Sequence, residues 1–278
     1  MQSHSIEAMS EQPILLTRSE AAHKNSFGHT WIFAGSVGYT GAPSLAAQGA
    51  MCVDVGLVSI ACPRHIWPIL AAQNLEAMVH PDHHAPWQSA DAILAGPGWG
   101  MQQSERLHQL IEHRAPLVLD ADALNMVARH PSLSNAVLHR PFPTVLTPHA
   151  GEAARLLSTT PHTIQQQRTI AIQALVEKFQ CTVVLKGAGT LTASPQQPIR
   201  QCFRGSPRLA RAGTGDVLAG MIAGLLAQAH AGQSKLHPQT WAEQAVVLHA
   251  RAGEEPHWYR AGQLPSLIAD LIAESYAG

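Results

Sequence analysis

The sequence has little charge, few aromatic residues and few cysteines. Only 13% of its 278 residues are charged, 5% are aromatic, and the formal net charge of −1 comes with no long run of one sign. Nucleic-acid binders carry a basic patch or stripe, so we expect no nucleic-acid partner. No stretch looks like a membrane span, so we expect no membrane partner either.

The N-terminus lacks the basic segment followed by an apolar one that marks a secretory signal, so we expect a cytoplasmic protein. The four cysteines are far apart in apolar surroundings, which predicts buried, reduced thiols and neither disulfides nor a metal site. Histidine is frequent, with 17 residues, and three of them cluster in HPDHH. The neighbouring prolines, Pro81 and Pro86, predict a surface loop there and no metal site.

Short apolar runs alternate with stretches of helical periodicity over most of the chain. This alternation predicts an α/β fold with a mainly parallel central sheet and helices on both faces, in which ligands bind beyond the carboxyl ends of the strands. We expect strands at 30–34, 56–61, 91–96, 115–120, 143–147 and 181–187, the first followed by a helix near 43–53. After residue 205 we expect helices alone, at about 215–229, 239–254 and 264–275.

No low-complexity linker and no internal repeat divides the sequence. We therefore expect one domain over residues 1–278, with about residues 1–12 loosely ordered.

The stretch AGTGDVLAG places Asp216 behind a glycine-rich turn, in the first turn of an expected helix. Aspartate at this place is often only a helix cap. The backbone amides of Gly213, Thr214 and Gly215 could instead surround an anion such as phosphate, because glycine permits close approach and helix N-termini attract negative charge.

The same helix has glycine at positions 220 and 224, one turn apart in its interior. Each glycine costs about 1 kcal/mol relative to alanine in a helix. Their presence predicts that another backbone packs very close to this helix.

Five further loops are expected at the carboxyl edge of the sheet: GSVGYTGAP (35–43), GPGWG (96–100), DADALN (120–125), TPHAGE (147–152) and KGAGT (186–190). Each alone has ordinary turn composition. Together with AGTGDVLAG, and in this order, they are specific enough to indicate one protein family.

This set of motifs resembles the ADP-dependent (S)-NAD(P)H-hydrate dehydratase family of the ribokinase-like superfamily, over about residues 24–275. The resemblance implies a ribokinase-like fold and a repair enzyme that converts hydrated NADH and NADPH (NADHX and NADPHX) back to the coenzymes. ADP would be the phosphoryl donor, Mg²⁺ would be required, and AMP and phosphate would be released. It also implies a homotetramer and a separate NAD(P)HX epimerase, since we find no room for an epimerase domain in this chain.

The resemblance also implies roles for single residues. Asp216 is the expected catalytic base and a contact of the hydrated coenzyme, and the turn before it is the expected anion hole: Gly213, Thr214, Gly215. The other expected contacts of the hydrated coenzyme are Ala42, Gly98 and His149. The expected contacts of the adenine nucleotide are Lys186, Gly187, Ala188, Gly189, Thr190 and Gly215.

Each of these residues also has a simpler explanation. His149 could bond only its own loop at a helix start, Lys186 could be a solvated charge at the sheet edge, and Ala42 and Gly98 could be turn residues. We expect the two small residues to let a bulky dinucleotide approach the backbone.

The polar cluster of Asp120, Asp122 and Asn125 suits either water-mediated magnesium or the fixing of neighbouring loops, so no protein metal ligand is named. One departure from the family pattern stands before the anion hole, where relatives commonly have GNPG and this chain has GSPR. Ser206 lacks the amide of asparagine, and Arg208 adds charge and bulk near the expected nucleotide, so nucleotide preference could differ.

Two other functions remain open on the sequence. A ribokinase-like kinase of a small vitamin-precursor alcohol would share GTGD without needing TPHAGE and KGAGT, and a non-catalytic nucleotide sensor would keep the fold alone. A Rossmann dehydrogenase is disfavoured because GSVGYTG lacks the GxGxxG spacing.

Overall fold

The computed structural model describes residues 6–12 and 22–277, and over these residues the strands form one sheet. The strands stand in the order β1-β10-β9-β8-β7-β6-β5-β2-β3-β4, and β9 is the one that runs antiparallel to its neighbours. Their bounds are β1 (Ile6–Ala8), β2 (His29–Phe33), β3 (Leu57–Cys62), β4 (Met78–Pro81), β5 (Ala92–Ala95), β6 (Leu117–Leu119), β7 (Thr144–Leu146), β8 (Thr182–Leu185), β9 (Leu191–Ala193) and β10 (Ile199–Gln201).

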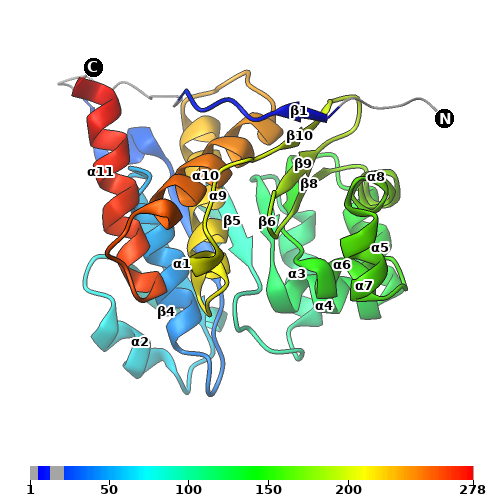
Figure 1. The fold of residues 1–278 in the computed structure, drawn as a ribbon. Helices are drawn as coiled ribbons and strands as arrows, with labels where there is room; N and C mark the ends of the chain where they lie inside the picture. The colour runs from blue at the N-terminus through cyan, green and yellow to red at the C-terminus, as the bar shows by residue number, and fades with distance from the viewer. Residues whose placement is uncertain (1–5, 13–21, 278) are drawn as a thin grey trace.

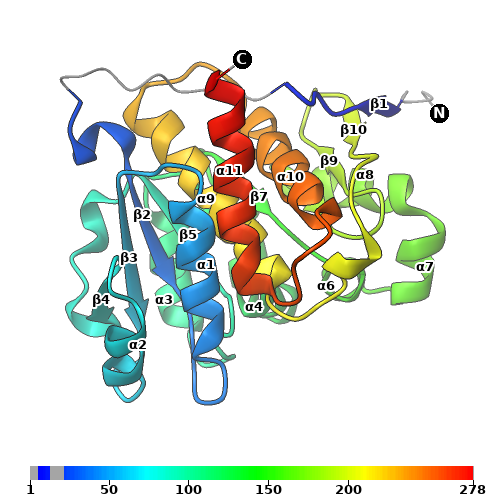
Figure 2. The ribbon, with the colours of Figure 1, turned by 60° about the vertical axis from the view of Figure 1, so that its left-hand side comes forward.

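Helices cover both faces of this sheet, as expected. One side carries α1 (Gly41–Met51), α9 (Thr214–Ala231), α10 (Pro238–Glu254) and α11 (Leu264–Ala277), with the short α2 (Trp67–Gln73) near its margin (Figure 1). The other side carries α3 (Ser104–Glu112), α4 (Ala121–Arg129), α5 (Pro131–Leu138), α6 (Ala150–Leu156), α7 (Pro161–Gln166) and α8 (Arg168–Phe179). Figure 2 shows α11 lying over α1 and α10.

The central strands are buried on both faces, which is why they are continuous apolar runs in the sequence. In β2, Ile32 faces the core under α1 and α9, whereas Trp31 and Phe33 face the core under α3 to α8. This alternation follows from the two-residue period of a strand. The six expected strands and the four expected helices are confirmed.

The sequence analysis missed β1, β4, β9 and β10. The HPDHH stretch is not all loop, since His80 and Pro81 belong to β4, at the edge of the sheet where proline is tolerated. The expectation of a loosely ordered start falls partly on residues 1–5, outside the described residues, whereas Ile6–Ala8 pair with β10. The four cysteines are free thiols, three of them buried. In the described part of the chain, no helix combines the length and apolar composition needed to cross a membrane.

Helices α1 and α9 are in backbone contact, which confirms the reason given for the interior glycines. A Cβ atom at Gly220 would run into the carbonyl oxygen of Ala46, and one at Gly224 would lie 2.8 Å from that of Ala50. Gly49 of α1 faces the carbonyl oxygen of Val217 in the same way. This contact fixes where α9, and therefore the turn before it, stands relative to β2 and β5.

We expect Gly220→Ala to lower the free energy of unfolding by about 2 kcal/mol or more, because overpacking against backbone outweighs the gain in helix propensity. Gly41→Ala is the matched control, since no atom lies within 4 Å of its added Cβ. It should leave stability unchanged or raise it. Urea unfolding of both variants checks this, and equal stabilities would refute the close contact.

Candidate active site at the carboxyl edge of the sheet

The structure brings the expected loops together at one edge of the sheet. The loop after β2 bonds the loop after β5, through Gly35 N to Pro97 O (2.9 Å) and Ser36 Oγ to Gly98 O (2.8 Å). Farther along this edge, Lys186 N after β8 donates to Pro148 O after β7 (2.8 Å). Parallel strands place their carboxyl ends on one side, so residues far apart in sequence meet there.

A buried ion pair stands in the middle of this edge. Lys186 Nζ donates to Asp120 Oδ1 at 2.6 Å, and Thr147 Oγ1 donates to the same oxygen at 2.8 Å. Burial alone would lower the pKa of Lys186, but the carboxylates of Asp120 and Glu152 raise it above its usual value, so the ammonium stays charged. Lys186 is therefore not a solvated charge at the sheet edge.

The ammonium of Lys186 lies beside the glycine-rich turn. A Cβ atom at Gly215 would stand 3.4 Å from Lys186 Nζ, and Gly213, with φ of 89°, is the N-cap of α9. No side chain of the residues that the structure describes caps this helix start. The amide of Thr214 donates to Arg211 O (3.4 Å), whereas within the described residues the amides of Gly213 and Gly215 have no backbone partner. Free amides at the positive end of the helix dipole, next to an ammonium, make the turn suited to an anion.

Asp216 lies in the first turn of α9, yet it is not a helix cap. Within the described residues, its carboxylate makes no hydrogen bond and no ion pair. Burial, together with the charges of Asp120 and Glu152, raises the pKa of Asp216 to about 7, against the opposing effect of Lys186. A free carboxyl group with a pKa near neutrality is suited to general base catalysis.

His149 starts helix α6 in a reciprocal capping box. Its Nδ1 accepts from Gly151 N (2.9 Å) and Glu152 N (3.3 Å), while the Glu152 carboxylate accepts from His149 N (2.8 Å). The helix-start role that the sequence left open is therefore present. About half of the His149 side chain is exposed, and its Nε2 lies 3.2 Å from Glu152 Oε1, so both ring nitrogens have partners in this loop.

Glu152, the partner of His149 in the capping box, was not singled out in the sequence. It is 4% exposed, and burial raises the pKa of its carboxyl group, with Lys186 acting in the opposite direction. His149 has a lowered pKa because of burial and the nearby Lys186 ammonium, so its ring is neutral at neutral pH.

Ala42 and Gly98 lie next to each other, where the first two loops meet. A Cβ atom at Gly98, with φ of +55°, would stand 2.7 Å from Tyr39 Cβ and 3.2 Å from Ala42 Cβ. Loop packing therefore requires the small residue at 98 whether or not a ligand is present. The close approach of a dinucleotide is not needed to explain it.

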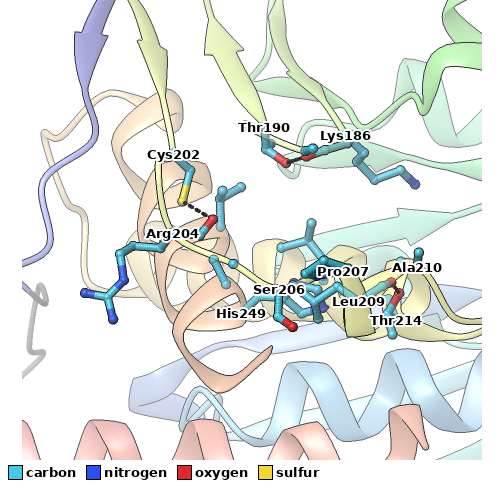
Figure 3. Close-up of a pocket in the computed structure, with 18 of the residues that line it drawn as sticks. Lys186, Thr190, Cys202, Arg204, Ser206, Pro207, Leu209, Ala210, Thr214 and His249 are labelled. Atoms are coloured by element: carbon cyan, nitrogen blue, oxygen red, sulfur yellow. Dashed lines mark hydrogen bonds between the residues drawn. The ribbon is translucent and has the colours of Figure 1, made fainter. Parts of the chain in front are cut away.

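A cavity of about 450 Å³ has Lys186 of the ion pair in its lining (Figure 3). One wall is the KGAGT loop, Lys186 to Thr190, and another is the segment 202–210 without Arg208, together with Thr214 and Gly215. The expected nucleotide contacts thus share one pocket. Ala42, Gly98 and His149 do not line it.

The pocket differs from the sequence-based expectation at Arg208, and it includes His249, which the sequence analysis did not name. Arg208 is not among the residues that line the pocket, and its guanidinium donates to the carbonyl oxygens of Glu255 (3.4 Å) and Pro256. Ser206 lines the pocket and caps the short helical turn Pro207–Leu209. The wall also includes His249 of α10, which no local sequence pattern distinguishes.

Arg168, at the start of α8, holds the KGAGT loop from behind. Its guanidinium donates to Leu185 O (2.9 Å), Lys186 O (3.3 Å) and Gly189 O (3.3 Å). These carbonyl groups are thereby occupied on the side away from the pocket, and the glycines at 187 and 189 adopt positive φ.

The remaining polar cluster ties loops together. Asp122 accepts from Gly100 N (2.8 Å) and Asn125 Nδ2 (3.4 Å), and Arg155 donates to Asn125 Oδ1 (2.9 Å). For Asp122 and Asn125, these bonds favour the structural explanation over the metal site.

Comparisons with known proteins agree on one family. The sequence profile of NAD(P)H-hydrate dehydratase matches residues 30–273. The ADP-dependent (S)-NAD(P)H-hydrate dehydratase of Neisseria meningitidis is 40% identical over 222 residues, covering 77% of this chain and 74% of that protein. A bifunctional NAD(P)H-hydrate repair enzyme of Coxiella burnetii is 37% identical over 94% of this chain and 52% of its own length. The chain spans about half the length of such bifunctional relatives.

Solved structures agree with the sequence match. The ADP/ATP-dependent NAD(P)H-hydrate dehydratase of Bacillus subtilis, co-crystallized with ATP and Mg²⁺, superposes with a TM-score of 0.82 at 26% identity. The match covers 97% of this chain and 99% of that one. The fold is the ribokinase-like α/β fold, as expected.

We expect Lys186→Met to lower the free energy of unfolding by about 3–5 kcal/mol, because it leaves the Asp120 carboxylate buried without its partner. The double variant Asp120→Asn with Lys186→Met should regain much of this loss. Arg204→Met, which breaks the more exposed pair with Glu254, is the control and should cost about 0–1 kcal/mol. If urea unfolding shows equal losses for the two single variants, the buried pair does not have this role.

Proposed function

The chain belongs to the NAD(P)H-hydrate dehydratase family, and we propose that it dehydrates the S epimer of NADH hydrate and NADPH hydrate with ADP, releasing AMP and phosphate. The observation that carries this proposal is the free carboxylate of Asp216, with a pKa near neutrality, at an uncapped helix N-terminus. It stands beside the Lys186 ammonium at the end of the pocket lined by KGAGT.

The proposed reaction has two steps. In the first, the hydroxyl group on the hydrated nicotinamide ring attacks the β-phosphorus of ADP. The bond from this phosphorus to the bridging oxygen breaks, and AMP leaves. Asp216 accepts the hydroxyl proton during this attack. The amides at the start of α9 and the Lys186 ammonium stabilise the charge that develops on the transferred phosphoryl group.

In the second step the new phosphate ester loses phosphate from the hydrated carbon and a proton from the neighbouring ring carbon. The double bond between these two carbons is thereby restored, and NADH or NADPH is released. The anion-binding turn favours this step as well, because it holds the departing phosphate.

We propose that the two substrates enter from opposite sides of Asp216. The nucleotide occupies the pocket beside β8 and β9, with Lys186 to Thr190 and Gly215 as contacts. The hydrated coenzyme lies over the loops after β2, β5 and β7, against Ala42, Gly98 and the exposed face of His149. The separation of these three residues from the nucleotide pocket supports this arrangement.

Mg²⁺ is part of the proposal, and the residues fit such an ion in part. Carboxylate oxygens, which Mg²⁺ prefers, are present at Asp120 and Glu152, but both groups already accept hydrogen bonds, from Lys186 and from His149 N, and we name no protein ligand of the ion. Within the described residues, however, no three carboxylate, histidine or cysteine side chains converge as a metal cage. Phosphate and water oxygens would supply most of the ligands, and the ion would neutralise phosphate charge.

The location, the oligomeric state and the partner enzyme also remain proposals. Four free thiols suit a reducing compartment, and we propose a cytoplasmic location. A homotetramer and a separate NAD(P)HX epimerase that supplies the S epimer stay predictions. Sedimentation of the purified chain tests the tetramer.

We expect Asp216→Asn to lower the turnover of hydrated NADH by about 100- to 10,000-fold, the usual loss when a general base is removed. The recovery of dihydronicotinamide absorbance in the near ultraviolet measures it. The affinity for ADP should be kept, because the amide has the same shape and the nucleotide pocket does not include position 216. Turnover within threefold of the native rate would refute the role of Asp216.

The rate should also depend on the charge of Asp216. Because the base is the carboxylate, the rate should fall about tenfold for each pH unit below its pKa of about 7 and level off above it. Glu152→Gln removes a charge that raises this pKa, so its acid limb should move to lower pH. A profile that is flat from about pH 5 to 8 in both proteins would contradict the assignment.

A further inference from the structure

His249 lies in the wall of the nucleotide pocket, although none of the motifs includes it (Figure 3). It belongs to α10 and is 7% exposed, and the other α10 residues in this wall, Val246 and Ala250, are apolar. Its Nε2 lies 3.0 Å from the carbonyl oxygen of Thr214, in the anion-binding turn.

The hydrogen bond to Thr214 fixes the tautomer of this histidine. A carbonyl oxygen can only accept, so Nε2 must carry the hydrogen and donate. Burial, and to a smaller degree the charge of Lys186, lowers the pKa of His249 to about 4, so the ring is neutral at neutral pH. In a neutral ring with hydrogen on Nε2, Nδ1 is an acceptor.

This acceptor has no partner in the part of the chain that the structure describes. Among the described residues, Nδ1 of His249 receives no hydrogen bond, and the bond from Nε2 to Thr214 O is the one hydrogen bond of the ring. Nδ1 is also not one of the described side-chain nitrogen atoms that are sealed from solvent without a partner, which are the indole nitrogens of Trp31, Trp99 and Trp241. A donor in the pocket can therefore reach it.

We propose that Nδ1 of His249 accepts a hydrogen bond from a ribose hydroxyl of the bound nucleotide. This inference rests on the proposed function, which puts ADP in this pocket. The phosphates are excluded as partners because their oxygens are acceptors at neutral pH. The ribose is favoured over the base because His249 stands next to the anion-binding turn, and the ribose is the part of ADP directly joined to the phosphates.

The two ring nitrogens of His249 would then have different partners. Nε2 donates to the carbonyl oxygen of Thr214 and so positions the turn that faces the phosphates, while Nδ1 accepts from the ribose. His249 is thus a binding residue toward the ribose and a positioning residue toward the turn. The two roles are separable, because they use different nitrogen atoms.

The test uses titration calorimetry with ADP, 2′-deoxy-ADP and 3′-deoxy-ADP on the native chain and on His249→Gln. Glutamine can keep a donor near the Nε2 position but offers no acceptor in place of Nδ1. His237→Gln is the matched control, because His237 caps the start of the same helix outside the pocket. His249→Asn is the complementary variant, since its side-chain oxygen can replace Nδ1 while the donor to Thr214 is lost.

One hydrogen bond corresponds to about a 3- to 10-fold change in affinity. We expect His249→Gln to weaken ADP binding by this factor, and one deoxy analogue to bind the native chain more weakly by the same factor. For that analogue, the native chain and His249→Gln should bind equally. His249→Asn should still distinguish ADP from that analogue, and His237→Gln should behave as the native chain.

Equal weakening of ADP and both deoxy analogues in His249→Gln would overturn the inference and leave only a structural role for the ring. Unchanged ADP binding in His249→Gln would overturn it as well. In both cases ADP still binds the native chain, and the proposed function stands. If ADP does not bind the native chain at all, the inference and the proposed function both fail.

Discussion

The ion pair between Lys186 and Asp120 is the interaction on which the rest of the site depends. It joins the carboxyl ends of β8 and β6 across β7, which adds the hydroxyl of Thr147 to the same carboxylate oxygen. Buried ion pairs are seldom a strong source of stability, since desolvation offsets the attraction. Its ammonium lies beside the glycine-rich turn and limits how far the pKa of Asp216 rises, whereas its carboxylate raises that pKa.

The second constraint is the backbone contact between α1 and α9. Without side chains at Gly49 and Gly220, the two helices approach so closely that α9 has little freedom to shift along or across its partner. The glycine-rich turn is therefore positioned by packing on one side and by the ammonium of Lys186 on the other. A general base that must meet a hydroxyl group within hydrogen-bond distance needs such positioning.

The sequence predicted the parts of this arrangement that depend on local composition and on the topology of parallel sheets. The buried strands are apolar runs, and the loops after them had to meet at one edge. The missed strands lack such runs, since β4 contains His80 and β10 contains Arg200 and Gln201. Three features of the site are tertiary contacts and leave no local pattern in the sequence. They are the bonds of Arg168 to carbonyl groups 17 to 21 residues away, the bonds of Arg208 and the bond of His249 to Thr214.

The membership in the NAD(P)H-hydrate dehydratase family and the free, partly buried carboxylate of Asp216 both support the proposed reaction, in which a kinase-like site is used for dehydration. The most direct test is the stoichiometry of that reaction. Hydrated NADPH is mixed with ADP, Mg²⁺ and the native chain, and AMP and NADPH are both quantified by chromatography over time. The account predicts one AMP for each NADPH restored. NADPH restored without AMP, or AMP formed without NADPH, would contradict it.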